Sequence, residues 1–221
     1  MKWYDAVLKN RVELRPIETE LEPKLEKLRG IKAVIFDVYG TLVVSGSGDV
    51  GSVDADDRGE QIAAAMDAVG IAVGSHSRPT IDDLHRQIRM SNESRKSESC
   101  PKPEVDIVDV WRRTLRDCGI NATTTEQLNR LAAEYESRAN PTWPMPGAKG
   151  LLSDLAGAGR KLGIVSNAQE FTLPLVEDLN GHFGVDSAFD LNLCVFSCRY
   201  RQAKPGPRLF NVLCDGLHRA G

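Results

Sequence analysis

Several side chains that could do chemistry follow two apolar runs of the sequence. The run "AVIF" leads into Asp37, and Tyr39 and Thr41 follow within "DVYGT". A second run, "KLGIV", leads into Ser166 and Asn167. A carboxylate at the end of a strand can attack an electrophilic carbon or phosphorus and form a covalent intermediate. A hydroxyl and an amide nearby can hydrogen-bond an anionic group of the substrate.

A basic side chain, Lys204, follows in the stretch "AKPGPRLF". Its ammonium group, if it lies beside Asp37, would stabilise the carboxylate and offset negative charge in a transition state. Thr41 either braces its loop through its hydroxyl or takes part in catalysis, and the sequence favours neither. We therefore predict that Asp37 is a nucleophile assisted by Lys204. Ser166 and Asn167 are predicted to bind the substrate.

A parallel sheet would bring these side chains together. The segments "IKAVIF", "KLGIVS" and "LNLCVF" are short apolar runs, and helical patterns lie between them. Such alternation is typical of an α/β fold whose parallel sheet is covered on both faces. Because "IKAVIF" is apolar on both faces, it is predicted to be a central strand. Ligand sites in these folds lie at the carboxyl ends of the strands, where Asp37 and Ser166 stand.

The span between the first two strands, residues 45–145, is too long for a single crossover helix. It opens with the flexible composition "SGSGDVGS", and amphipathic patterns then predict helices, for example in "EVDIVDVWRRTLRDCG". We interpret residues 45–145 as an inserted helical cap and residues 1–44 and 146–221 as the core. A charged amphipathic helix is predicted near the start of the core, at about residues 11–29.

The composition is that of an ordinary globular protein. The 221 residues have a net charge of −3, and no run of Lys and Arg suggests a nucleic-acid partner. No apolar stretch is long enough for a membrane span, and the charged first residues do not form a signal peptide. Five cysteines without a CxxC pair favour reduced thiols. We therefore expect a cytoplasmic protein, and a homo-oligomer stays open.

Three motifs together resemble those of the haloacid dehalogenase superfamily. "FDVYGTL" is similar to the first motif, "GIVSNA" to the second and "AKPGPRLF" to the third, in the order of the family and over residues 31–212. The resemblance implies a Rossmann-like, doubly wound sheet with a helical cap. It also implies a hydrolase that forms an aspartyl-enzyme intermediate on a small anionic substrate. The matching positions are Asp37, Tyr39, Thr41 and Lys204 for catalysis, and Ser166 and Asn167 for substrate binding.

Tyr39 bears on which reaction this hydrolase would carry out. Most members of the superfamily are magnesium phosphatases with a second aspartate at this position, which protonates the leaving group. Tyrosine has an ordinary pKa of about 10 and is a poor general base at neutral pH. The 2-haloacid dehalogenases share the pattern D-x-Y-G-T, and a halide leaves without a proton. The sequence therefore favours a dehalogenase without a cofactor. The alternative is a phosphomonoesterase whose Mg2+ is held by Asp37 and the backbone carbonyl of Tyr39.

Two departures from the family pattern keep a third alternative open. The dehalogenases tend to have tyrosine where this chain has Phe210. The acidic fourth motif has no counterpart, because only 17 residues follow Lys204 and Asp215 lies within a helical pattern. Either the sequence is a piece of a longer chain or the motif is missing, which would weaken magnesium binding and leave a sheet edge for a partner. The third alternative is a non-catalytic binding protein.

Overall fold

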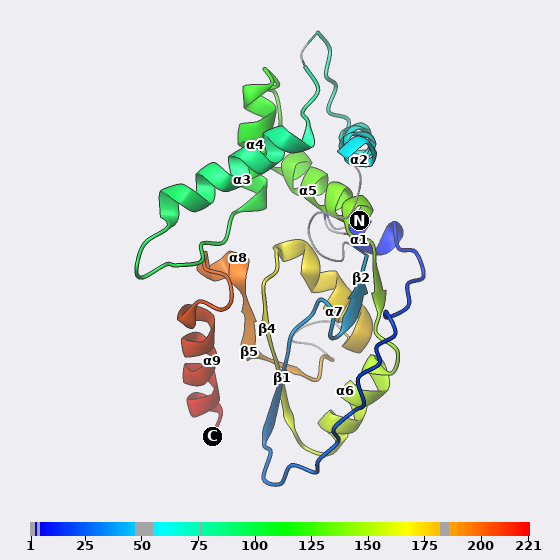
Figure 1. Ribbon diagram of the computed structural model, residues 1–221, viewed down its shortest axis with the longest axis vertical. Coiled ribbons are helices and arrows are strands. Elements are labelled where there is room, and N and C mark those ends of the chain that lie inside the picture. Colours follow the sequence, from blue (N-terminus) through cyan, green and yellow to red (C-terminus); the bar gives the residue numbers. More distant parts are fainter. Residues whose placement is uncertain (1–2, 4, 47–54, 76, 182–185) are drawn as a thin grey trace.

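The fold has two parts, a sheet covered by helices and a separate layer of helices from residues 55–139 above it (Figure 1). Among the described residues, no helix is both long and apolar enough to cross a membrane. The five cysteines are all free thiols. The computed structural model describes residues 3, 5–46, 55–75, 77–181 and 186–221.

The sheet consists of parallel strands in the order β1-β4-β5. These are the three strands predicted from the sequence, so the parallel α/β fold is confirmed. The central strand is β4, not β1. All four residues of β1 are only half-buried, because β4 is its one neighbour among the described strands. The prediction that β1 is central is therefore wrong. The strands are β1 (Ala33–Phe36), β4 (Lys161–Ser166) and β5 (Phe189–Phe196).

Helices cover both faces of this sheet. Leu209 and Leu213 of α9 (Pro207–Ala220) pack against Val165 of β4 and Val195 of β5. On the other face, α6 (Ala148–Gly157) and α7 (Leu173–Asn180) contribute to the larger hydrophobic core. The short elements η1 (Glu170–Thr172) and α8 (Ser197–Tyr200) lie just after the carboxyl ends of β4 and β5.

The upper layer, here called the helical layer, occupies the span that we interpret as a cap. Its helices lie in the chain between β2 and β3, an antiparallel pair. Trp111 is fully buried within the layer and packs edge-to-face on Tyr135, with ring centroids 5.2 Å apart. Part of "SGSGDVGS" lies outside the described residues. The elements are β2 (Val43–Ser45), α2 (Ala55–Ala68), α3 (Ile81–Arg95), α4 (Ile107–Asp117), α5 (Thr125–Ala139) and β3 (Thr142–Pro144).

The N-terminal segment differs from its prediction. It begins with a short helix, α1 (Ala6–Lys9). Residues 11–28 have no regular secondary structure, so the predicted helix over residues 11–29 is wrong. Pro16 and Pro23 lie inside that stretch, and proline removes a backbone donor that an α-helix needs. An amphipathic helix also needs a surface for its apolar face, yet Ile17 and Leu25 are 93% and 92% exposed.

Candidate active site

Asp37 and Lys204 form an ion pair where the strands end. Asp37 directly follows β1, and Nζ of Lys204 lies 2.6 Å from its Oδ2 atom. The same ammonium donates to the carbonyl of Val165 in β4, at 3.1 Å. The Asp37 side chain remains 41% exposed, so a solute can reach it. The structure thus brings together two predicted site residues that are far apart in the sequence.

Asn167 fixes the backbone of Lys204. The N–H group of Lys204 donates to Oδ1 of Asn167 at 2.6 Å, and Nδ2 of Asn167 donates to the Lys204 carbonyl at 3.5 Å. The loop after β4 is therefore tied to the loop before α9. In this arrangement the Asn167 amide positions the lysine. A contact with substrate, which the sequence predicted, would compete with these hydrogen bonds.

Ser166, the last residue of β4, has a completely buried side chain. Its hydroxyl has no hydrogen-bond partner in the part of the chain that the structure describes. A buried polar group without a partner costs about 1–3 kcal/mol. Such a group marks a place where a ligand could complete the hydrogen bonding.

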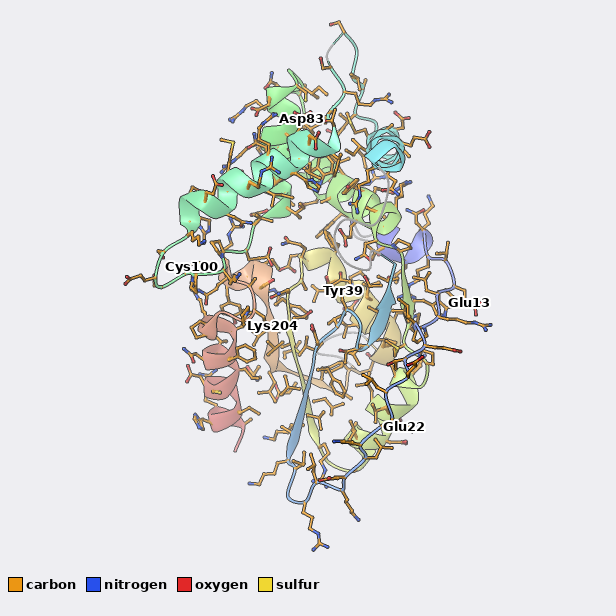
Figure 2. All side chains as sticks on the ribbon, in the orientation of Figure 1. Glu13, Glu22, Tyr39, Asp83, Cys100 and Lys204 are labelled. Atoms are coloured by element: carbon orange, nitrogen blue, oxygen red, sulfur yellow. The ribbon has the colours of Figure 1, made fainter. Side chains whose placement is uncertain are left out.

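The Tyr39 side chain is anchored to the core. Its hydroxyl lies 2.9 Å from Oγ1 of Thr172, which is fully buried. Burial raises the pKa of Tyr39 far above its usual value, and the negative charge of Glu136 in α5 raises it further, while the hydrogen bond to Thr172 partly opposes the shift. Tyr39 therefore stays protonated at neutral pH and cannot act as a base. Tyr39 and Lys204 both lie just below the helical layer in Figure 2.

The loop between Asp37 and β2 is a tight turn. Gly40 has a φ of 74°, a backbone conformation that favours glycine, and its N–H group donates to the carbonyl of Val43 at 2.8 Å. Thr41 follows in this turn with an exposed side chain. Its hydroxyl has no hydrogen-bond partner among the residues described, so the bracing of this loop comes from the backbone.

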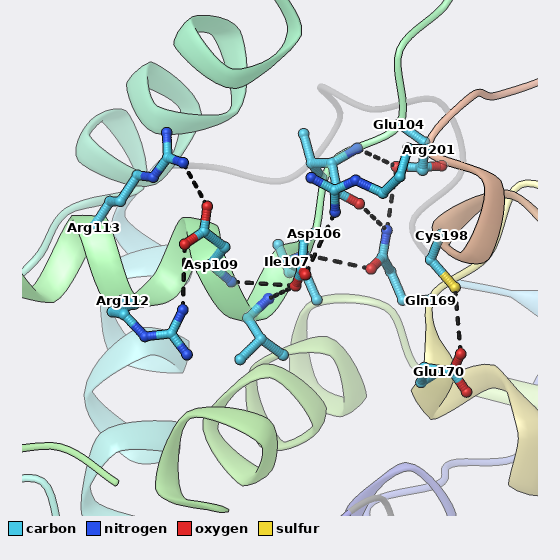
Figure 3. A network of polar contacts seen from close by, with 12 residues as sticks. Glu104, Asp106, Ile107, Asp109, Arg112, Arg113, Gln169, Glu170, Cys198 and Arg201 are labelled. Atoms are coloured by element: carbon cyan, nitrogen blue, oxygen red, sulfur yellow. Dashed lines mark hydrogen bonds and ion pairs between the residues drawn. The ribbon is translucent and has the colours of Figure 1, made fainter. Parts of the chain in front are cut away.

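Sequence reasoning missed a second polar cluster, which joins the helical layer to the core (Figure 3). Glu104, just before α4, accepts hydrogen bonds from Oγ of Ser197 at 2.6 Å and Nε2 of Gln169 at 3.2 Å. The Ser197 hydroxyl also accepts from the N–H group of Ala168. Burial raises the pKa of Glu104, and these hydrogen bonds oppose the shift only partly. No sequence motif marks this joint.

Two arginines near Lys204 are engaged with acidic partners. Arg199 donates to both carboxylate oxygens of Glu170, at 2.8 and 3.0 Å. Nη1 of Arg201 lies 3.5 Å from Oδ2 of Asp106 in the joint to the helical layer. Neither side chain therefore offers its charge to a substrate at Asp37 in this arrangement.

The site residues do not fit the Mg2+ ion that a phosphatase would use. The Asp37 carboxylate is already paired with the Lys204 ammonium, and its Oδ1 atom accepts from the N–H group of Val38. The described residues contain no group of three or more His, Cys, Asp or Glu side chains that could hold a metal ion. A cation at Asp37 would have to compete with Lys204.

Comparison with known proteins identifies the class. The model of the haloacid dehalogenase-like hydrolase family matches residues 31–221, which is most of the chain. The chain belongs to this family and is a hydrolase. No curated protein matches it.

Solved structures with a similar fold share 19% sequence identity with this chain. One is a predicted phosphoglycolate phosphatase from Haemophilus somnus, with a TM-score of 0.41 over 85% of this chain and 72% of that one. Another is a dehalogenase, with a TM-score of 0.40 over 87% of this chain and 74% of the other. These similarities concern the fold and not the reaction.

Proposed function

We propose that this hydrolase uses Asp37 as a nucleophile on a small anionic substrate, with chemistry of the 2-haloacid dehalogenase type. The observation that carries the proposal is the state of Tyr39. This residue stands where a phosphatase would have an acid, and its buried hydroxyl is held by Thr172 with a strongly raised pKa. The reaction that suits such a site is one whose leaving group needs no proton.

The proposed first step is a displacement at carbon. One oxygen of Asp37 attacks the carbon that carries the halogen, and a carbon–oxygen bond forms as the carbon–halogen bond breaks. The halide leaves with the bonding electron pair. The resulting ester of Asp37 is neutral, so the ammonium of Lys204 then becomes available to the substrate carboxylate. The unpartnered hydroxyl of Ser166 is a second donor for that anion.

The proposed second step is hydrolysis. Water attacks the carbonyl carbon of the Asp37 ester, and the bond from that carbon to the ester oxygen breaks. A 2-hydroxy acid leaves, the carboxylate is restored, and one proton passes to solvent. We propose that the helical layer acts as the cap that limits the access of other water to this site.

A magnesium-dependent phosphomonoesterase is the second candidate. The ammonium of Lys204 and the hydroxyl of Ser166 would suit a phosphoryl group as well as a carboxylate. An alkoxide leaving group, however, needs a proton that Tyr39 does not readily supply. The donors near Asp37 also suit Mg2+ poorly, which ranks this function second.

Halide release from 2-chloropropionate tests the proposal. Wild-type protein should release chloride with or without a chelator, and Asp37→Asn should reduce the rate to background. Asp215→Asn, at an exposed carboxylate of α9, is the matched control. Phosphate release from small alkyl phosphomonoesters that needs both Mg2+ and Asp37 would overturn the dehalogenase proposal. If the wild-type protein releases neither chloride nor phosphate, the result would favour a non-catalytic binding protein.

A further inference from the structure

A pocket of about 190 Å3 lies where three parts of the chain meet. The core contributes Phe171 and Arg201, the helical layer contributes Val108 and Asn129, and the N-terminal segment contributes Trp3. The two core segments are neighbours of candidate site residues in the sequence, because one follows Asn167 and the other leads to Lys204. Trp3 lies before residue 31, where the family match begins.

Every charged side chain of the pocket wall already has a partner. Arg201 faces Asp106 at 3.5 Å, and Glu170 receives two hydrogen bonds from Arg199. The described residues of the wall therefore offer no unpaired counter-charge to an ionised group, so the pocket favours an uncharged one. The rest of the wall is largely apolar and includes Trp3, Val108 and Phe171.

One polar group of the wall remains available. Asn129 of α5 lines the pocket, and its amide makes no hydrogen bond within the part of the chain that the structure describes. An amide can both donate and accept. A wall whose charged side chains are already paired, and in which one amide can still form hydrogen bonds, suits a small uncharged group that carries one hydroxyl or carbonyl.

Trp3 is partly buried against the hydrophobic core, and the segment that follows it makes further contacts. Ala6 and Val7 of α1 are buried. Nδ2 of Asn10 donates to Oγ of Ser137 in α5 at 2.8 Å, and Nη1 of Arg11 pairs with Oδ2 of Asp178 in α7 at 2.7 Å. The segment therefore bridges the helical layer and the core, and α1 lies beside α5 in Figure 1.

We propose that this pocket binds a small, uncharged and largely apolar group of the substrate, and that Trp3 determines which group fits. An apolar cavity of about 150 Å3 holds benzene, so the group is no larger than about one aromatic ring. The link to the reaction rests on the proposed function, in which the anionic end of the substrate lies at Lys204. The substrate is then a small acid with an uncharged ring or alkyl side group.

Binding of benzyl alcohol to the full chain tests the pocket without any turnover. Titration followed by ligand-observed NMR should show saturable binding, and benzylammonium, which has the same size but carries a positive charge, should bind at least about tenfold more weakly. Trp3→Ala should weaken the binding of benzyl alcohol by about tenfold, because one aromatic wall is lost. Val108→Phe should abolish it by filling the pocket. Trp143→Ala, in β3, should leave it unchanged.

The results separate this proposal from the proposed function. No saturable binding of benzyl alcohol, or equal affinity in the wild type, Trp3→Ala and Val108→Phe proteins, would overturn the pocket proposal. Benzylammonium that binds as tightly as benzyl alcohol would overturn the assignment of an uncharged group to the pocket. If benzyl alcohol binds as expected while 2-chloropropionate releases no chloride, the pocket proposal is supported and the dehalogenase proposal is rejected.

Discussion

Two carboxylates near the carboxyl end of the sheet have opposite surroundings. Asp37 is 41% exposed and has an ammonium partner 2.6 Å away. Glu104 is half-buried, and both of its oxygens accept hydrogen bonds from uncharged donors. A substrate can reach the first, whereas the second holds two segments together. The same chemical group is thus proposed to react in one place, whereas in the other it joins two segments of the chain.

Removing the charged partner of Asp37 should have the largest effect. Lys204→Met removes the ammonium that stabilises the carboxylate and would bind the substrate anion, so we expect kcat/KM to fall about 10²- to 10³-fold. Chloride release from 2-chloropropionate measures the change. Lys149→Met, on the exposed face of α6, is the control and should match the wild type.

Removing a partner of Glu104 should instead affect stability. Ser197→Ala deletes the hydroxyl that donates to Glu104 and accepts from Ala168. The Glu104 carboxylate and the N–H group of Ala168 each lose that hydrogen bond. We expect a loss of about 1–3 kcal/mol in the free energy of unfolding, measured by urea denaturation. Ser153→Ala, at an exposed position of α6, is the control. Unchanged stability in Ser197→Ala would mean that the joint does not depend on this hydrogen bond.

The sequence predicted one carboxylate of this pair and not the other. The place of Asp37 at the sheet edge is predictable because it ends an apolar strand within a motif, and the carboxyl ends of parallel strands meet at one edge. Glu104 and Ser197 are 93 positions apart and belong to no motif. Their contact depends on how the helical layer rests on the core, and no local pattern encodes that.

The errors in the fold prediction have a related cause. Apolar residues on both faces of β1 indicated a central strand. A strand's place in a sheet depends on its neighbours, however, and β4 is the only described strand that pairs with β1. The leucine spacing of residues 11–29 indicated a helix. That spacing stabilises a helix only where another surface receives the apolar face.

The pH dependence of stability should distinguish Glu104 from exposed carboxylates. Burial raises its pKa in the folded state, so the folded protein holds this proton more tightly than the unfolded chain does. Its contribution to stability is complete below the unfolded pKa of about 4.3 and is lost as the pH rises through the folded pKa. Relative to Glu104→Gln, the wild type should therefore lose unfolding free energy as the pH rises above about 4.3.

Urea denaturation at several pH values between about 4 and 7 measures this difference. Glu98→Gln, at an exposed position before the joint, is the control and should follow the wild type. If the wild type and Glu104→Gln change in parallel over this range, Glu104 keeps an ordinary pKa in the folded protein, and the contrast with Asp37 would rest on exposure alone.

The smallest expected effect concerns Tyr39, which lies two residues after the proposed nucleophile, Asp37, but whose contacts are those of a structural group. Tyr39→Phe removes only the hydrogen bond to Thr172, so we expect a loss of about 1 kcal/mol in unfolding free energy. Because its raised pKa keeps the hydroxyl protonated, kcat/KM should change less than about tenfold, with the pH profile of the rate unchanged. Chloride release across pH measures both. A much larger fall in rate, with loss of one limb of the pH profile, would show that Tyr39 transfers a proton. Tyr39 would then be grouped with Asp37 as a reactive side chain.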